Sequence, residues 1–348
     1  MKNVWQRMRW LAVCLMIVCG MTAAQASDSG PSTQDEQGVI KLTFLGTGAP
    51  RPSEKRSGPA ILVEAGPHRF LVDAGSGARE QMFRSGGWEL ITGLDTILIT
   101  HLHYDHMIDV PDIAMTGWMY GRRVPMTVYG PKGTKDMSRH FMKALQWDLD
   151  MRRLVGIPME GSNIVAHDIK PGVILDKDGL KITAFEVEHM PIDAETEEPL
   201  PFYGQTLGFR VDYKGRSVVF SGDTRSTPKS QLLVHGKDVD VMVHEVQVPS
   251  PGDSKEAKLA NMSLSVHTTP AQAGYIFQQT KPRMAVYSHI IPPDTTGEQL
   301  VAETKPYYQG PVTTAEDFMT ITIGAGIVIG EQARSGTHVF EKSSVVKD

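Results

Sequence analysis

Four side chains able to bind a metal occur within six consecutive residues, and this cluster restricts the possible fold more than any other feature. They are His101, His103, Asp105 and His106, in the pattern H-x-H-x-D-H directly after the apolar stretch 96–100, which is typical of a buried strand. Neutral imidazole and carboxylate oxygen are ligands that zinc and similar divalent metals prefer. A polar loop with several histidines by chance does not explain this density. The pattern therefore predicts a metal site at the end of a strand.

Further candidate ligands follow later strand-like stretches in the same way. His189, Asp223 and His289 each come shortly after a short apolar or alternating run. Alone, each would be interpreted as a surface or hydrogen-bonded side chain. Their shared position after a strand predicts that they complete the metal site begun by the first motif.

The order of these motifs resembles that of the metallo-β-lactamase superfamily. The H-x-H-x-D-H motif precedes a histidine, a Gly-Asp-Thr segment at 222–224 and a last histidine. The segment 72–77 resembles the D-x-G element of that family, and 44–48 resembles its opening strand and turn. The resemblance covers residues 40–289. It implies an α/β fold, a four-layer αββα sandwich in a single domain, with a dinuclear metal site at one edge.

The resemblance also implies a role for each motif residue. It assigns one metal to His101, His103 and His189, the second to Asp105, His106 and His289, a bridging role to Asp223, and a ligand-orienting role to Asp73. Asp105 is counted with the catalytic residues as well. Two divalent ions per chain are expected, with zinc preferred and manganese or iron as alternatives. Ions about 3.5–4 Å apart can hold a bridging hydroxide as nucleophile, which favours a hydrolase.

A second set of residues indicates the branch of the superfamily. His244-Glu245, the later segment 265–269 around His267, and the turn 46–50 resemble the ribonuclease Z-like branch. The resemblance implies that His267 protonates the leaving oxygen as general acid and that Glu245 orients it. The alternative for His267 is a structural hydrogen bond at the start of a helix. A bridging Asp223 argues against β-lactam hydrolysis, because the true β-lactamases of the superfamily lack it.

Ribonuclease Z itself fits the pattern less well than secreted, arylsulfatase-like members of the branch. The tRNA-clamping arm of ribonuclease Z normally lies between the positions of His189 and Asp223, where this chain has room for a loop and two strands. The loop 191–201 is acidic. We therefore expect hydrolysis of a small-molecule sulfate or phosphate ester, with a lactone or carboxylic ester as the alternative. A tRNA endonuclease and a non-catalytic metal-binding protein are less favoured interpretations.

The N-terminus has the pattern of a secretory signal peptide. Lys2, Arg7 and Arg9 precede the apolar run 10–21 and a small-residue segment ending at Ala26. The run is shorter than the ~20 residues that span a bilayer. We expect a signal peptide at 1–26, a disordered leader at 27–38 and the hydrolase domain at 39–348. The mature protein would be periplasmic or secreted, without membrane contact.

Composition further restricts the kinds of binding partner that we expect. Both cysteines, Cys14 and Cys19, belong to the expected signal peptide, so the mature chain would have no disulfide and no thiolate ligand. The net charge of -5 becomes more negative when the basic N-terminus is removed. An acidic surface argues against a phosphate-backbone partner, so we expect no nucleic acid. A homo-oligomer is left open.

The stretch 107–170 carries Trp118, Tyr120, Phe141 and Trp147 among several methionines. We expect most of these side chains to pack in the core and a minority to border a substrate opening.

Overall fold

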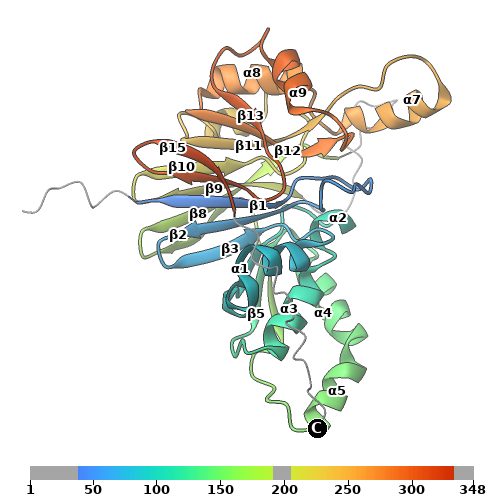
Figure 1. Ribbon diagram of the computed structural model, residues 1–348, viewed down its shortest axis with the longest axis vertical. Coiled ribbons are helices and arrows are strands. Elements are labelled where there is room, and N and C mark those ends of the chain that lie inside the picture. The colour runs from blue at the N-terminus through green and yellow to red at the C-terminus, as the bar shows by residue number, and fades with distance from the viewer. Residues whose placement is uncertain (1–37, 191–204, 333–348) are drawn as a thin grey trace, which may run out of the picture. The chain divides into compact units, whose positions relative to one another are not determined.

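Two β-sheets form from the aliphatic and alternating stretches of the sequence, and helices flank them in the computed structural model (Figure 1). The structure describes residues 38–190 and 205–332. The predicted signal peptide, all but the last residue of the predicted leader, and the acidic loop 191–201 lie outside these residues. Export and the domain boundaries therefore remain predictions. No helix of the described residues is long and apolar enough to cross a membrane.

The first sheet has the strand order β15-β14-β1-β2-β3-β4-β5-β6 among the described residues. Its strands from β15 to β3 are antiparallel, and those from β3 to β6 are parallel. The strands are β1 (Ile40–Gly46), β2 (Ala60–Ala65), β3 (His68–Val72), β4 (Thr96–Leu98), β5 (Met126–Gly130), β6 (Ile164–Asp168), β14 (Met319–Ile323) and β15 (Ile327–Glu331).

The second sheet has the order β13-β12-β11-β10-β9-β8-β7. Parallel pairs join β10 to β13, and antiparallel pairs join β7 to β10. The strands are β7 (Gly172–Lys177), β8 (Leu180–Val187), β9 (Thr206–Tyr213), β10 (Arg216–Phe220), β11 (Val241–Gln247), β12 (Met284–Ile291) and β13 (Val312–Thr314).

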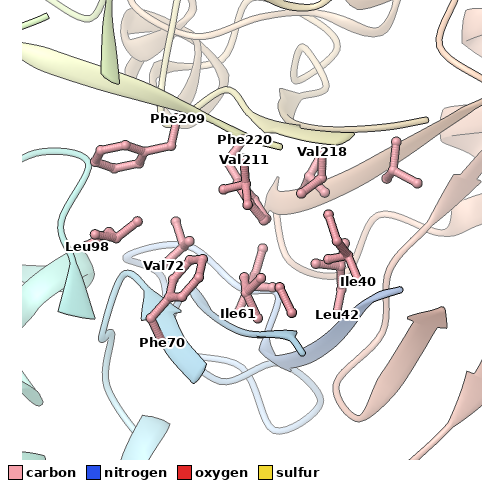
Figure 2. Close-up of a cluster of buried hydrophobic side chains, with 14 of the residues drawn as sticks. Ile40, Leu42, Ile61, Phe70, Val72, Leu98, Phe209, Val211, Val218 and Phe220 are labelled. Atoms are coloured by element: carbon pink, nitrogen blue, oxygen red, sulfur yellow. The ribbon is translucent and has the colours of Figure 1, made fainter. Parts of the chain in front are cut away.

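The inner faces of the two sheets pack on each other through a continuous apolar core. Figure 2 shows side chains of the first sheet, such as Phe70 and Val72, opposite Phe209 and Phe220 of the second. These residues alternate with outward-facing ones along each strand, as the two-residue period of a strand requires. Burial of this surface between the sheets provides the main driving force for the sandwich.

Helices cover both outer faces. Those of the first half of the chain, chiefly α1 and α3, bury apolar side chains against the first sheet, while α6, α8 and α9 do so against the second. The helices are α1 (Ala78–Gly93), α2 (Tyr104–Met107), α3 (Val110–Met119), α4 (Thr134–Ala144), α5 (Gln146–Leu154), α6 (Leu232–His235), α7 (Lys255–Asn261), α8 (Pro270–Thr280) and α9 (Gly297–Thr304). The layers are therefore helix, sheet, sheet, helix, which confirms the predicted αββα sandwich.

Strand direction determines where the site can form. Strands β8, β10, β11 and β12 all run in the same direction, because β9 is antiparallel to both of its neighbours and the other pairs are parallel. Their carboxyl ends therefore lie along one edge of the second sheet. In the first sheet, β3 and β4 are parallel, so the residues that follow these two strands lie at the same edge of that sheet.

The aromatic residues of 107–170 divide between core and surface. Trp118 is fully buried beside Met115 and Leu149, and its indole nitrogen donates to the carbonyl of Pro158 (2.8 Å). Phe141 packs partly buried against the core of the first sheet. Trp147 and Tyr120, however, are 75% and 62% exposed. The expectation that these aromatic side chains pack in the core is therefore correct for Trp118 and Phe141 only. Composition does not indicate which face of a helix packs against the sheet.

Candidate metal centre and active site

The D-x-G element begins the site, immediately after β3. Asp73 has a left-handed backbone (φ 61°), which is uncommon outside glycine. Its carboxylate accepts hydrogen bonds from the Thr100 amide (2.8 Å), the Thr100 hydroxyl (3.0 Å) and His106 Nδ1 (2.8 Å). These bonds offset the energetic cost of the backbone conformation. A Cβ on Gly75 would lie 2.3 Å from the backbone oxygen of Asp105, so only glycine allows this close approach. The element therefore positions the H-x-H-x-D-H motif.

The histidine motif lies where β4 ends and α2 begins. β4 ends at Leu98, two residues earlier than the expected strand, because Thr100 turns toward Asp73. His103 precedes α2 in an extended conformation, and Asp105 and His106 lie within the helix, both buried. The change from extended chain to helix directs the first two histidines and the last two motif residues to neighbouring positions.

All seven predicted ligands come together in the structure, and Asp223 lies at their centre. Its Oδ2 is 3.3 Å from Nε2 of both His106 and His289 and 3.8 Å from Nε2 of both His101 and His189. His103 Nδ1 is 2.9 Å from His101 Nε2 and 3.2 Å from His189 Nε2. Asp105 Oδ2 is 3.4 Å from His289 Nε2 and 3.5 Å from His106 Nε2. Residues from four strand ends and one helix thus converge.

Hydrogen bonds at the far side of the rings decide which nitrogens face this centre. The Thr100 hydroxyl donates to Asp73, so it accepts from His101 Nδ1 (3.0 Å) and leaves His101 Nε2 without a proton. His189 Nδ1 donates to the carbonyl of Val266 (2.8 Å), which leaves its Nε2 without a proton as well. The unprotonated Nε2 atoms of His101 and His189 therefore both face the position occupied by His103 Nδ1 and Asp223 Oδ2, where they are available as metal ligands.

The pKa values of three of these histidines agree with a ligand role. Burial lowers the pKa of His101 well below its usual value, lowers that of His103, and lowers that of His189 to about 4. These imidazoles are therefore neutral near pH 7, as metal ligation requires. Burial also lowers the pKa of His106, but the carboxylates of Asp223 and Asp73 outweigh it and hold the pKa well above its usual value.

The residues present fit a metal centre. Two groups of side chains have ligand atoms within 4.8 Å of one another, and each group can hold an ion: His101, His103, His189 and Asp223 form one, and Asp105, His106 and His289 the other. The buried His106 Nε2 lies 3.3 Å from Asp223 Oδ2 and 3.5 Å from Asp105 Oδ2, so it faces carboxylate oxygens from both groups. The cluster is thus able to bind metal ions.

Asp73 gives a direct test of this arrangement. The Asp73→Asn variant should keep the fold, since asparagine tolerates a left-handed backbone, yet weaken metal binding by ~10–100-fold. In the neutral ring that metal ligation requires, the new amide N–H would need His106 Nδ1 to accept, and the ring proton would then lie on Nε2, the atom facing Asp223. Competitive chelator titration measures the change. Asp112→Asn, at a more exposed carboxylate paired with Arg79, is the matched control. Equal affinity in both variants would refute the orienting role.

His267 and Glu245 lie beside the cluster. Glu245, buried near the end of β11, accepts at Oε1 from the backbone amides of Thr224 and Thr268 (both 3.1 Å). His267 Nδ1 is 3.2 Å from the same oxygen. Burial lowers the pKa of His267, but the Glu245 carboxylate more than reverses this and raises it to about 9. His267 is therefore a cation near pH 7 whose Nε2 is free of Glu245.

The ring of His267 lies between the two candidate ligand groups. Its centroid is 4.8 Å from that of His189 and 5.8 Å from that of His289. Together with Asp223 and His289 it forms a third group able to hold an ion, so geometry permits it a ligand role that the motif order did not suggest. The ion pair with Glu245 favours a proton-donor role, and a mutational test that separates the two is described in the Discussion.

Sequence reasoning missed three contributors to the site. Thr100 fixes both Asp73 and the tautomer of His101, the carbonyl of Val266 fixes that of His189, and Gln247 accepts a hydrogen bond from Ser263 in the segment that precedes His267. The position of Thr100 between the strand and the motif was a usable signal. The other two act through contacts that have no local pattern.

Comparison with known proteins agrees with this description. A family model described as "Beta-lactamase superfamily domain" matches residues 68–290. The chain is 30% identical over 294 residues to ribonuclease Z of Mycobacterium avium (strain 104), covering 82% of this chain and 99% of that protein. It is 29% identical over 264 residues to ribonuclease Z of Mycobacterium sp. (strain KMS), covering 75% and 87%. The crystal structure of human tRNase Z, short form, has a TM-score of 0.59 at 23% identity, covering 81% and 98%.

The sandwich with a His/Asp cluster at its strand ends defines a metal-dependent hydrolase acting on ester bonds. The chain belongs to the metallo-β-lactamase superfamily, in its ribonuclease Z-like branch. This confirms the resemblance found in the motifs.

One expectation is wrong. We expected no nucleic-acid partner, yet the relatives carry the names ribonuclease Z and tRNase Z, which belong to enzymes that act on nucleic acid. The expectation used net charge, which sums over the whole surface, whereas binding of a phosphate backbone depends on local charge. The acidic loop that supported it lies outside the described residues.

Proposed function

We propose that this protein is a dinuclear metal-dependent phosphodiesterase in which His267, held by Glu245, protonates the leaving oxygen. The observation that carries the proposal is the ion pair between His267 Nδ1 and Glu245 Oε1 (3.2 Å), beside a cluster able to bind metal. A phosphodiester releases an alkoxide or phenoxide, and a poor leaving group of this kind gains most from a positioned acid. The names of the relatives support a phosphodiester over a lactone or a sulfate ester.

The chain's own residues would divide the work as follows. His101, His103 and His189 would hold one ion, Asp105, His106 and His289 the other, and Asp223 would contact both. When bound, the ions supply charge stabilisation and activation of water. Glu245 keeps the proton on His267 Nδ1, and His267 Nε2 gives its own proton to the departing oxygen. The amides of Thr224 and Thr268 hold the carboxylate of Glu245 in place.

A substrate panel tests the proposal. Purified protein loaded with zinc or manganese should hydrolyse bis(4-nitrophenyl) phosphate faster than 4-nitrophenyl sulfate, 4-nitrophenyl phosphate, a lactone or a chromogenic β-lactam. Treatment with a chelator should abolish this activity, and added metal should restore it. A 3′-extended tRNA in the same panel shows whether the protein prefers a phosphodiester in RNA or one in a small molecule. Faster cleavage of the sulfate or the lactone than of both diesters would contradict the proposal.

A further inference from the structure

The connection between β11 and α8 carries two groups that act at the site. It contains α7 and a 3₁₀ turn (Met262–Ser265), and His267 lies near its end, shortly before α8 begins at Pro270. Figure 1 shows α7 and its loop projecting away from the sheets. The carbonyl of Val266 and the imidazole of His267 both belong to this projecting segment, so something must hold it against the metal centre.

Gln247, the last residue of β11, makes that attachment. Its side chain is 1% exposed, which means that its amide is almost fully withdrawn from water. Nε2 donates to the carbonyl of Ala260 (2.9 Å), and Oε1 accepts from the hydroxyl of Ser263 (3.0 Å). The Gln247 backbone amide also donates to the carbonyl of Thr268 (2.8 Å). The residue thus contacts the segment at three points.

Ser263 connects Gln247 to the two groups that act at the site, the Val266 carbonyl and His267. Its carbonyl accepts from the backbone amides of Val266 (3.0 Å) and His267 (3.1 Å). The carbonyl of Val266 in turn accepts from His189 Nδ1 (2.8 Å), which sets the tautomer of that ring. One short series of hydrogen bonds therefore connects Gln247 to a candidate metal ligand and to the proposed acid.

We propose that Gln247 is a positioning residue that acts through Ser263 to hold His267 and the Val266 carbonyl in place. This inference rests on the proposed function. A misplaced acid slows the reaction although every reactive group is present, because catalysis is sensitive to small displacements. Loss of the attachment should therefore impair proton donation more than it impairs folding.

The test replaces the amide by an apolar group of similar size. Gln247→Leu should lower kcat by ~10-fold for a diester with an alkoxide leaving group, in line with the loss of a supporting contact, and much less for one with nitrophenoxide. KM should change little. Gln81→Leu, at a glutamine that is also buried (3% exposed) but bonds Asp317, is the matched control and should show no dependence on the leaving group. Ser263→Ala, which removes only one of the contacts, should give a smaller effect in the same direction if Gln247→Leu fails to fold.

Hydrogen exchange of metal-free protein provides a readout without turnover. The amides of residues 262–268 should exchange faster in Gln247→Leu than in the wild type or in Gln81→Leu. If these amides exchange at the wild-type rate in Gln247→Leu, the residue does not attach the segment. If they exchange faster but kcat falls equally for both leaving groups, Gln247 does not position the acid. If the wild type cleaves no diester, the proposed function fails, whereas the exchange result still decides whether Gln247 holds the segment.

Discussion

Asp223→Asn should retain less than one metal ion per chain and show no measurable hydrolysis. The reason is that Oδ2 of this one side chain lies 3.3–3.8 Å from ring nitrogens of both ligand groups. Loss of its charge removes the only carboxylate of the first group and the shared contact with the second. Elemental analysis after growth with ample zinc and manganese measures the content, with wild type expected at about two ions per chain.

Asp240→Asn is the matched control for this change. Asp240 is also a buried aspartate, but it precedes β11 and therefore lies at the opposite end of the strand from Glu245. Its carboxylate bonds Ser217 and Arg283, so the substitution should lower stability and leave the metal content unchanged. If Asp223→Asn kept one ion at wild-type affinity, the shared role of Asp223 would be wrong.

His267→Ala should keep both metals and the fold, yet slow turnover by ~10²–10⁴-fold, the range typical of a lost general acid. The defect should be small for nitrophenoxide, which leaves readily without a proton, and large for alkoxides. Rates on a series of diesters, together with metal content, measure both effects.

Glu245→Gln provides the companion variant. Removal of the charge beside Nδ1 should lower the proton affinity of His267 and reduce the rate less than His267→Ala does. The double variant should be no slower than His267→Ala alone, because two residues that act as a unit are not additive. Metal loss in His267→Ala would identify the residue as a ligand of the third group. Equal defects across leaving groups would instead indicate substrate positioning.

Much of the site was predictable because ligand chemistry is local. Imidazole and carboxylate side chains at H-x-H-x-D-H, and single ligands just after strand-like runs, indicate a metal centre before any contact is known. The start of the helix Pro270–Thr280 likewise has a local sequence signal, since Thr269 and Gln272 form a capping box around Pro270. The αββα arrangement followed from the resemblance of the motif order.

Other features depended on which segments meet in space. Trp118 and Trp147 both lie in helices, α3 and α5, yet the first is fully buried and the second is 75% exposed, because only Trp118 packs among neighbouring apolar side chains. The nucleic-acid expectation failed for a related reason, since net charge contains no information on where charges lie.

The sequence by itself determined which side chains able to bind a metal are present and that they lie at or near the ends of strand-like runs. Through the family resemblance it also predicted a histidine acid with a carboxylate partner. The tertiary structure alone decided that Asp223 Oδ2 lies among four imidazoles, that Val266 sets the tautomer of His189, and that Gln247 holds the segment of His267. The physical reason is that side-chain chemistry is a property of single residues. Distances between strand ends, by contrast, follow from sheet order and strand direction, which depend on contacts between residues far apart in the chain.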